Sequence, residues 1–210
     1  MKHLSKSASY AKQRGIALFF ALIALLAISL AAVALIRSVD TSTLIAGNLA
    51  FRQAATTSGD GGIEAAVSWL NTTQAANSTK NVLTDPTHPF NITSATSGYY
   101  SNMNPALSLT DGTGIQWDNT DSVLAGTDNS GNTLRYIIQR MCRTADVAIQ
   151  NAGCLFSGAA LDNNGQAIPL PQEICIGAGC PAAGQAPQIR ITARTTGPRN
   201  TISYIQAFVY

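Results

Sequence analysis

The feature that most constrains this chain is an unbroken apolar run near its N-terminus, from Ile16 to Ile36. The run reads IALFFALIALLAISLAAVALI, and Ser29 is its one polar residue. As an α-helix, these 21 residues (16 to 36 inclusive) would be about 31 Å long, which matches the roughly 30 Å hydrocarbon core of a bilayer. A helix satisfies its own backbone polar groups, and Ser29 can return its hydroxyl to a carbonyl one turn back. The run therefore predicts a transmembrane helix over 16–36.

The charged residues around the run indicate its orientation. Four basic residues precede it without an acid, namely Lys2, Lys6, Lys12 and Arg14, and Arg37 follows it. Because Lys and Arg accumulate on the cytoplasmic side of a membrane helix, we expect the chain after Arg37 to lie outside the cytoplasm.

The same basic stretch accounts for the formal net charge of +2. Without it, 13 − 4 = 9 Lys and Arg face 11 Asp and Glu, which leaves a balance of −2. A nucleic-acid-binding protein concentrates positive charge on its folded part, so this distribution argues against nucleic acid as a partner. Only 11% of the residues are charged, against about 25% in typical soluble domains, and such a composition is typical of exported surface proteins.

Three kinds of protein share such an N-terminus. A cleaved secretory signal could use Ala32-Val33-Ala34 as its cleavage site, although its apolar core would exceed the roughly 7–15 residues usual for such signals. A single-span membrane anchor would keep the whole run. In the third kind, a basic leader ends in Lys12-Gln13-Arg14-Gly15 and the apolar helix begins at once.

That third boundary resembles the type IV prepilin signal. The resemblance implies that a prepilin peptidase cuts between Gly15 and Ile16, so that residues 1–15 form the leader and Ile16 becomes the N-methylated first residue. Most pilins carry a glutamate at the fifth mature position, where this chain has Phe20. In the family, that carboxylate is thought to pair with the N-terminal amine of a neighbouring subunit inside the apolar filament core. A subunit without it suits the filament tip.

Residues 37–76 are predicted to continue the helix outside the membrane. Ile63, Val67 and Leu70 recur at helical spacing and form an apolar stripe. The segment Gly59-Asp60-Gly61-Gly62 predicts a kink or a break, because each interior glycine costs about 1 kcal/mol relative to alanine. It lacks the pattern of a phosphate-binding loop, which argues against nucleotide binding.

From about Asn71 the composition shifts to Asn, Thr, Ser and Gly, and 71–132 is predicted to form loops with short strands or helical turns. Three later segments, 134–142, 188–195 and 202–210, carry strand patterns. The last two flank a turn at Gly197-Pro198-Arg199-Asn200 and predict an antiparallel hairpin in which Ile189, Ile191 and Ala193 share one face.

Two further stretches resemble PilX-type minor pilins, a group that also commonly lacks the fifth-position glutamate. Near the N-terminus these are Arg37-Ser38, Ile45-Ala46-Gly47-Asn48-Leu49 and Arg52-Gln53-Ala54, and near the C-terminus they are 190–194 and 197–201. We therefore expect an α+β, type IV pilin-like fold. Its long N-terminal helix, formed by 16–36 and 37–76, would pack on a C-terminal antiparallel sheet within a β-rich head over 77–210.

All four cysteines, Cys142, Cys154, Cys175 and Cys180, fall in this head. An even number in an exported chain predicts two disulfides. A zinc site is the alternative, but the cysteines are separated by eleven, twenty and four residues and lack the usual C-x2-C pairs. Of the three possible pairings, the local one (Cys142–Cys154 and Cys175–Cys180) is favoured, and the other two stay open.

Other polar residues are weaker candidates. His88 lies in a turn-rich stretch without a nucleophile motif nearby, so we expect a solvent-exposed loop histidine. A calcium site would need the oxygens of Asp118, Asp121, Asp128, Asn129 and Asn132. Their spacing does not fit an EF-hand loop, and turn formation explains the same residues.

These patterns predict a minor pilin that primes a type IV pilus or lies at its tip, and not an enzyme. No cofactor or metal is expected. The expected partners are other minor and major pilins, prepilin peptidase, the pilus assembly machinery and the inner membrane. The head would lie in the periplasm and later on an extracellular pilus. The alternatives are a single-span, membrane-anchored periplasmic ligand-binding or sensor protein, and an exported hydrolase cleaved after Ala34.

Overall fold

The computed structural model describes residues 16–109, 114–158, 161, 163–166, 175–182 and 184–210. The predicted leader 1–15, with Gly15, lies outside the described residues. The chain forms two compact units, Met1–Leu49 and Ala50–Tyr210.

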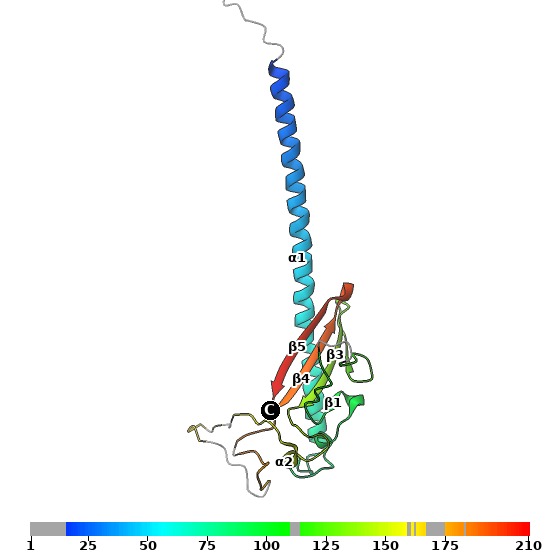
Figure 1. The fold of residues 1–210 in the computed structure, drawn as a ribbon, viewed down its shortest axis with the longest axis vertical. Helices are drawn as coiled ribbons and strands as arrows, with labels where there is room; N and C mark the ends of the chain where they lie inside the picture. The colour runs from blue at the N-terminus through cyan, green and yellow to red at the C-terminus, as the bar shows by residue number, and fades with distance from the viewer. Residues whose placement is uncertain (1–15, 110–113, 159–160, 162, 167–174, 183) are drawn as a thin grey trace, which may run out of the picture. The chain divides into compact units, whose positions relative to one another are not determined.

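The helix α1 runs without interruption from Ile16 to Ala76 and contributes to both units (Figure 1). In the first unit it is the whole of the described structure. In the second unit it supplies residues 50–76, which pack against the sheet. Its last residue is also the last residue of the predicted helical segment 37–76.

The predicted break at 59–62 is wrong, because α1 continues through these glycines. The buried positions of the helix are Ala55, Gly59, Gly62, Ala66 and Leu70. A Cβ atom added at Gly59 would lie 2.5 Å from Cδ1 of Ile205, and one added at Gly62 would lie 3.0 Å from Cβ of Ala193. The glycines allow the helix to lie close to the sheet, and this packing outweighs their low helix propensity.

The second unit contains a five-stranded sheet in the order β1-β3-β4-β5, with β2 also paired to β3. The strands are β1 Tyr99–Tyr100, β2 Val123–Thr127, β3 Thr133–Arg140, β4 Ile189–Thr196 and β5 Ile202–Val209. The short helices of this unit are η1 Pro89–Asn91, η2 Ala95–Ser97, α2 Ile149–Ala152 and η3 Pro198–Asn200. The predicted hairpin is confirmed: β4 and β5 pair antiparallel, with Ala193 opposite Ile205.

The sheet is mixed, so the prediction of an antiparallel sheet is wrong for one strand pair. β1 runs parallel to β3, with Tyr99 beside Ile138 and Tyr100 beside Gln139. This pairing depends on tertiary contacts, because a strand of two residues is too short to show an alternating pattern.

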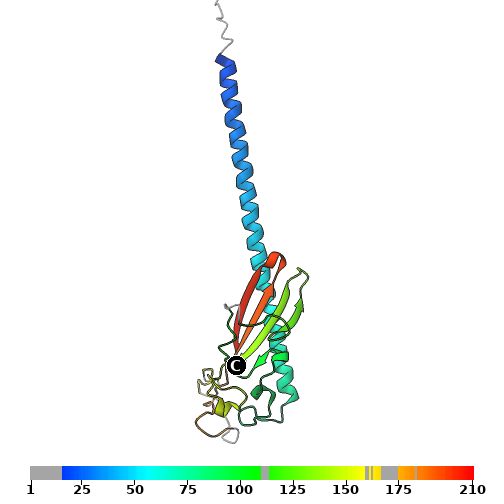
Figure 2. The same cartoon turned by 45° about the vertical axis from the view of Figure 1, so that its right-hand side comes forward.

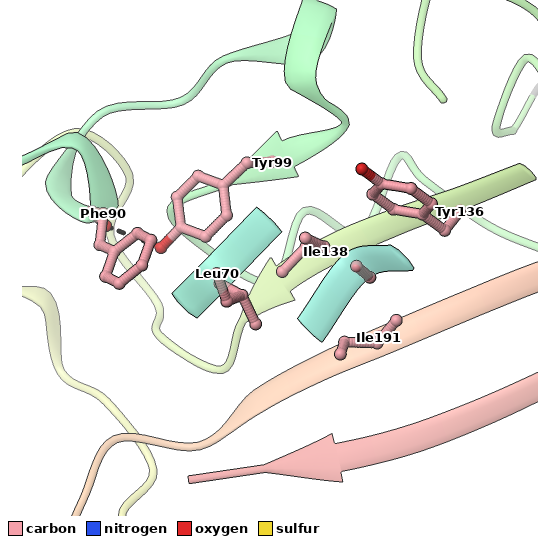
Figure 3. Packing of buried hydrophobic residues seen from close by; sticks show 7 residues of the cluster. Leu70, Phe90, Tyr99, Tyr136, Ile138 and Ile191 are labelled. Atoms are coloured by element: carbon pink, nitrogen blue, oxygen red, sulfur yellow. Dashed lines mark hydrogen bonds between the residues drawn. The ribbon is translucent and has the colours of Figure 1, made fainter. Parts of the chain in front are cut away.

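The hydrophobic core lies between α1 and one face of the sheet (Figure 2). Its buried members come from α1, η1, β1, β3 and β4 and are Ala66, Leu70, Phe90, Tyr99, Tyr136, Ile138 and Ile191. Figure 3 shows the cluster, with all of these except Ala66 labelled. Ile63 and Val67 are partly buried against this cluster. The predicted stripe of Ile63, Val67 and Leu70 therefore packs on the core, and Leu70 is the buried member of the three.

The opposite face of the sheet carries a smaller cluster of Tyr100, Ile115 and Ile137. Trp117 packs beside it, with its ring centroid 5.6 Å from that of Tyr204. The two faces together make an α+β head in which both sides of β3 are covered.

Candidate functional site

The described part of the first unit is an exposed apolar helix. No side chain in its most apolar stretch is buried, and no other helix in the described ranges is both long and apolar enough to cross a membrane. Ile16 is its first residue and is 59% exposed. By length and composition, this segment can serve as a membrane anchor.

Four hydroxyls of this helix donate to carbonyl oxygens within it. The Ser29 hydroxyl donates to the carbonyl oxygens of Leu25 at 2.7 Å and Leu26 at 3.0 Å, which confirms the prediction for this residue. Thr41, Ser42 and Thr43 each donate to the carbonyl four residues earlier. The 16–36 stretch therefore has no side chain that requires water.

Apolar exposure continues beyond Arg37. Leu44, Ile45 and Leu49 are all more than 60% exposed. The exposed helix thus runs from 16 to 49, or 34 residues, and is about 51 Å long. This length exceeds the roughly 30 Å core of one bilayer.

The residues predicted for processing lie at the start of this helix. Phe20 is exposed, one turn after Ile16, and its ring stands edge-on to that of Phe19 with centroids 6.4 Å apart. Gly15 lies outside the described residues, and so does the Gly15–Ile16 bond.

The head contains two disulfides, Cys142–Cys154 and Cys175–Cys180. With all four sulfurs paired, no thiolate is left for a zinc site. Cys142 is buried just after β3, and its bridge joins the end of that strand to the segment after α2. The backbone of Leu155 strengthens this junction, because its N–H donates to Met141 at 2.8 Å and its carbonyl accepts from Gln188 at 3.0 Å.

A buried arginine organises the loops beside the core. Arg140 is 1% exposed, and the acceptors of its guanidinium among the described residues are neutral: the carbonyls of Ser101 (2.8 Å), Phe90 (2.8 Å) and Val147 (3.0 Å), and Oδ1 of Asn91. Burial lowers the pKa of Arg140, and nearby Tyr99 and Asp146 oppose that shift. This role was not predicted from the sequence. The signal was an arginine two residues after Ile138, on the core-facing side of a predicted strand.

His88 is fully buried, so the prediction of an exposed loop histidine is wrong. It precedes η1 as its N-cap, and Nδ1 accepts a hydrogen bond from the Phe90 N–H at 3.1 Å. Its ring centroid lies 5.1 Å from that of Phe90. Burial lowers the pKa of His88, and the charge of Lys80 adds to the effect. The charge of Asp85 opposes this shift, and the contacts of the ring give His88 a structural role as the cap of η1.

The residues considered for calcium hold turns together. Asp118 accepts from Thr120 N–H, Asp121 accepts from Gln116 N–H, and Asp128 accepts from the N–H groups of Ser130 and Asn132, each at 2.8 Å. Hydrogen bonds lower the pKa of Asp128 to about 2, and the one from Ser58 has the largest effect, followed by those from Asn132. Within the described ranges, no three His, Cys, Asp or Glu side chains gather in a metal-binding group.

A cavity of about 480 Å³ opens beside the core between α1 and the sheet of the second unit. Apolar side chains such as Val67, Phe90, Ile189 and Val209 line most of it, and Arg140 contributes to its wall. A cavity of this size and character can hold a small apolar ligand.

Comparisons with protein-family models, curated proteins and solved structures returned no match. The geometry alone therefore assigns what the molecule can do. It provides an apolar helix that can anchor the chain in a membrane, and a disulfide-braced α+β head.

Proposed function

We propose that this chain is a minor pilin that primes a type IV pilus or lies at its tip. The helix 16–36 holds the subunit in the inner membrane with the head in the periplasm, and the subunit then joins other minor and major pilins in the filament. In this role the chain has a structural task and catalyses no reaction.

One observation carries the proposal: on a single helix, exposed apolar side chains extend from Ile16 to Ile36 and recur at Leu44, Ile45 and Leu49, beyond a mostly polar stretch at 37–43. A plain anchor needs only about 20 apolar residues. The exposed Leu44, Ile45 and Leu49 lie beyond such a span and need other protein surfaces to cover them. Packing among the helices of neighbouring subunits covers both parts of the helix at once.

Moving the helix from lipid into a filament changes its hydrophobic energy little, because one apolar medium replaces another. Close packing of backbones must then favour association. Small residues at spacings of three and four mark one face of the helix, namely Ala24, Ala27, Ala31 and Ala34. Phe20 lies on this same face, four residues before Ala24.

Phe20 provides the experimental test. In cells with a type IV pilus system, Phe20→Glu would supply the carboxylate that the family uses to dock beneath another subunit. We expect the fraction of the chain recovered in sheared filaments to change relative to wild type, measured by quantitative immunoblotting.

Phe19→Glu is the matched control, because Phe19 and Phe20 are 63% and 64% exposed and the change adds the same charge one position away. It lies off the alanine face and should lower membrane insertion without changing the ratio of filament-bound to membrane-bound chain. If Phe20→Glu behaves as wild type or as Phe19→Glu, the tip role is contradicted.

The cavity of about 480 Å³ favours a second candidate function. A single-span, membrane-anchored periplasmic sensor would use it to bind a small apolar ligand. This candidate requires the chain to keep Met1, whereas the pilin proposal requires it to begin at Ile16.

A further inference from the structure

The sheet face turned away from α1 carries a second cavity, of about 390 Å³. The strands supply its polar side through Gln139, Arg190, Thr192 and Gln206. The loop between β1 and β2 supplies an apolar side, which includes Leu107 and Leu109.

Strand register sets the polar side. Gln139 on β3 lies opposite Arg190 on β4, and Thr192 on β4 lies opposite Gln206 on β5. Nη2 of Arg190 donates to Oε1 of Gln139 at 2.5 Å. Nε2 of Gln206 donates to the Thr192 hydroxyl oxygen at 3.1 Å.

Two donors remain without acceptors in this arrangement. Gln139 is 1% exposed, and because its Oε1 accepts from Arg190, the opposite end of its amide is Nε2, which has no partner among the described atoms. Nε of Arg190 is also buried without a partner among them. Both groups can only donate, and a buried donor without an acceptor is destabilising, so the cavity is suited to a ligand rich in acceptors.

The charge of the residues on this face also favours a ligand rich in hydrogen-bond acceptors. No described residue lining the cavity is Asp or Glu, whereas Arg190 is cationic. On the same face, Arg194 follows two residues along β4, and Arg135 lies opposite it on β3. Burial lowers the pKa of Arg135, the nearby carboxylate of Asp118 opposes that shift, and the neighbouring Arg194 adds to it. The positive charge of Arg190 and the unpaired donors together favour an anion in the cavity.

We propose that this cavity binds a small organic carboxylate. The carboxylate accepts from Gln139 Nε2 and from the guanidinium of Arg190, and the compact apolar body of the ligand lies against Leu107 and Leu109. A guanidinium matches a carboxylate in a bidentate arrangement, which gives the site its specificity for charge and shape. This function is additional to filament assembly and does not depend on it.

The test uses the full chain, ¹⁵N-labelled in detergent micelles, with benzoate as the probe and benzamide as its neutral counterpart of similar shape. NMR spectra would follow the side-chain resonances of Gln139 Nε2 and Arg190 Nε during each titration. We expect saturable shifts with benzoate and none with benzamide.

Two variants separate binding at this site from other effects. Arg190→Gln removes the charge and should weaken benzoate binding about tenfold or more. Gln139→Glu keeps a hydrogen-bond acceptor for Arg190, so the fold is retained, but its carboxylate takes the ligand's place and should abolish binding. Arg143→Gln, at an exposed arginine outside the cavity, is the control and should bind as wild type.

Equal shifts with benzoate and benzamide would overturn the proposal, as would the absence of shifts with benzoate. Unchanged benzoate binding in Gln139→Glu would also overturn it, because partitioning into the micelle would then explain the shifts. None of these results bears on whether Ile16 is the mature N-terminus, so the pilin proposal is tested separately.

Discussion

At positions 59 and 62 of α1 the side chain is a single hydrogen atom, and the sheet lies where a methyl group would be. Composition alone predicts that these glycines weaken the helix. The structure gives them a packing role, because Ile205 and Ala193 occupy the adjacent space. Whether a glycine breaks a helix or permits a close approach depends on its partner across the interface, which is distant in the sequence.

Alanine substitutions at two neighbouring glycines of α1, Gly62 and Gly61, test this packing role. Gly62→Ala places a methyl group 3.0 Å from Cβ of Ala193, which cannot move without its backbone, and we expect a loss of about 1–2 kcal/mol in the free energy of unfolding. Gly61→Ala meets only Cδ2 of Leu134 at 3.8 Å and should gain about 0.5–1 kcal/mol from helix propensity. Thermal unfolding of the full chain in detergent would measure both, and shifts of the same sign would contradict the packing role.

The protonation of Asp128 should make the stability of the fold depend on pH. Its carboxylate accepts from Ser58, Ser130 and Asn132, and its pKa is lowered to about 2, against about 3.9 in an unfolded chain. Because the folded pKa is the lower one, the stabilisation is fully present above about pH 4 and is lost as the pH falls towards 2.

Unfolding midpoints between pH 7 and pH 2 would test this dependence. Asp128→Asn should be less stable than wild type at pH 7, and the difference should shrink as wild-type Asp128 is protonated. Asp60→Asn, at an exposed aspartate on α1, serves as the control and should follow the wild-type curve. A constant gap between Asp128→Asn and wild type across the range would show that protonation of this carboxylate is not responsible.

Two buried polar residues mark the limit of prediction at this scale. His88 was expected in solvent and is buried as a cap, and Arg140 was not recognised as the centre of a hydrogen-bond network. Arg140 depends on backbone carbonyl oxygens, and His88 depends on the N–H and the ring of Phe90. These partners lie in segments whose sequence shows no helix or strand periodicity. The strand pattern could place Arg140 on the core face, but not the four acceptors that surround it.

At the scale of elements, the strands with a clear sequence pattern were predicted correctly. The segments 134–142 and 188–195 show β-favouring composition or strict alternation, and they form β3 and β4 within two residues of the expected bounds. β1 has two residues and β2 has five, with an irregular register near Gly126. Neither shows a clear pattern, so the parallel pairing of β1 could not be predicted.

The two disulfides should differ in their effect on stability. Cys142–Cys154 spans a sequence separation of 12 and Cys175–Cys180 one of 5, and closing the larger loop removes more entropy from the unfolded chain. Replacing the first pair by alanines should cost about 3 kcal/mol and replacing the second about 2 kcal/mol.

Urea midpoints of the two double variants in detergent would measure this order. The first pair also joins the end of β3 to the segment after α2, whereas both cysteines of the second pair are only half-buried. A larger loss for the second pair would contradict the assignment of Cys142–Cys154 as the main covalent brace of the head.

At the scale of the whole molecule, the two units differ in how much of their apolar surface they bury. The unit Ala50–Tyr210 buries its own core, whereas the described residues of Met1–Leu49 bury almost nothing. A helix with such an apolar surface needs lipid or other helices around it. The sequence predicts this requirement directly, because a run of 21 residues (16 to 36) in which Ser29 is the one polar residue has few alternatives to a lipid or protein environment.

The pilin proposal requires that this helix remain part of the mature protein and begin at Ile16. Intact mass and N-terminal sequencing of the chain, purified from the membranes of cells with a type IV pilus system, test it most directly. We expect a mature chain that starts at N-methylated Ile16 and has lost residues 1–15. A retained Met1 would contradict the pilin proposal and favour the anchored sensor. A start at Leu35 would contradict both, because the mature protein would lack the helix.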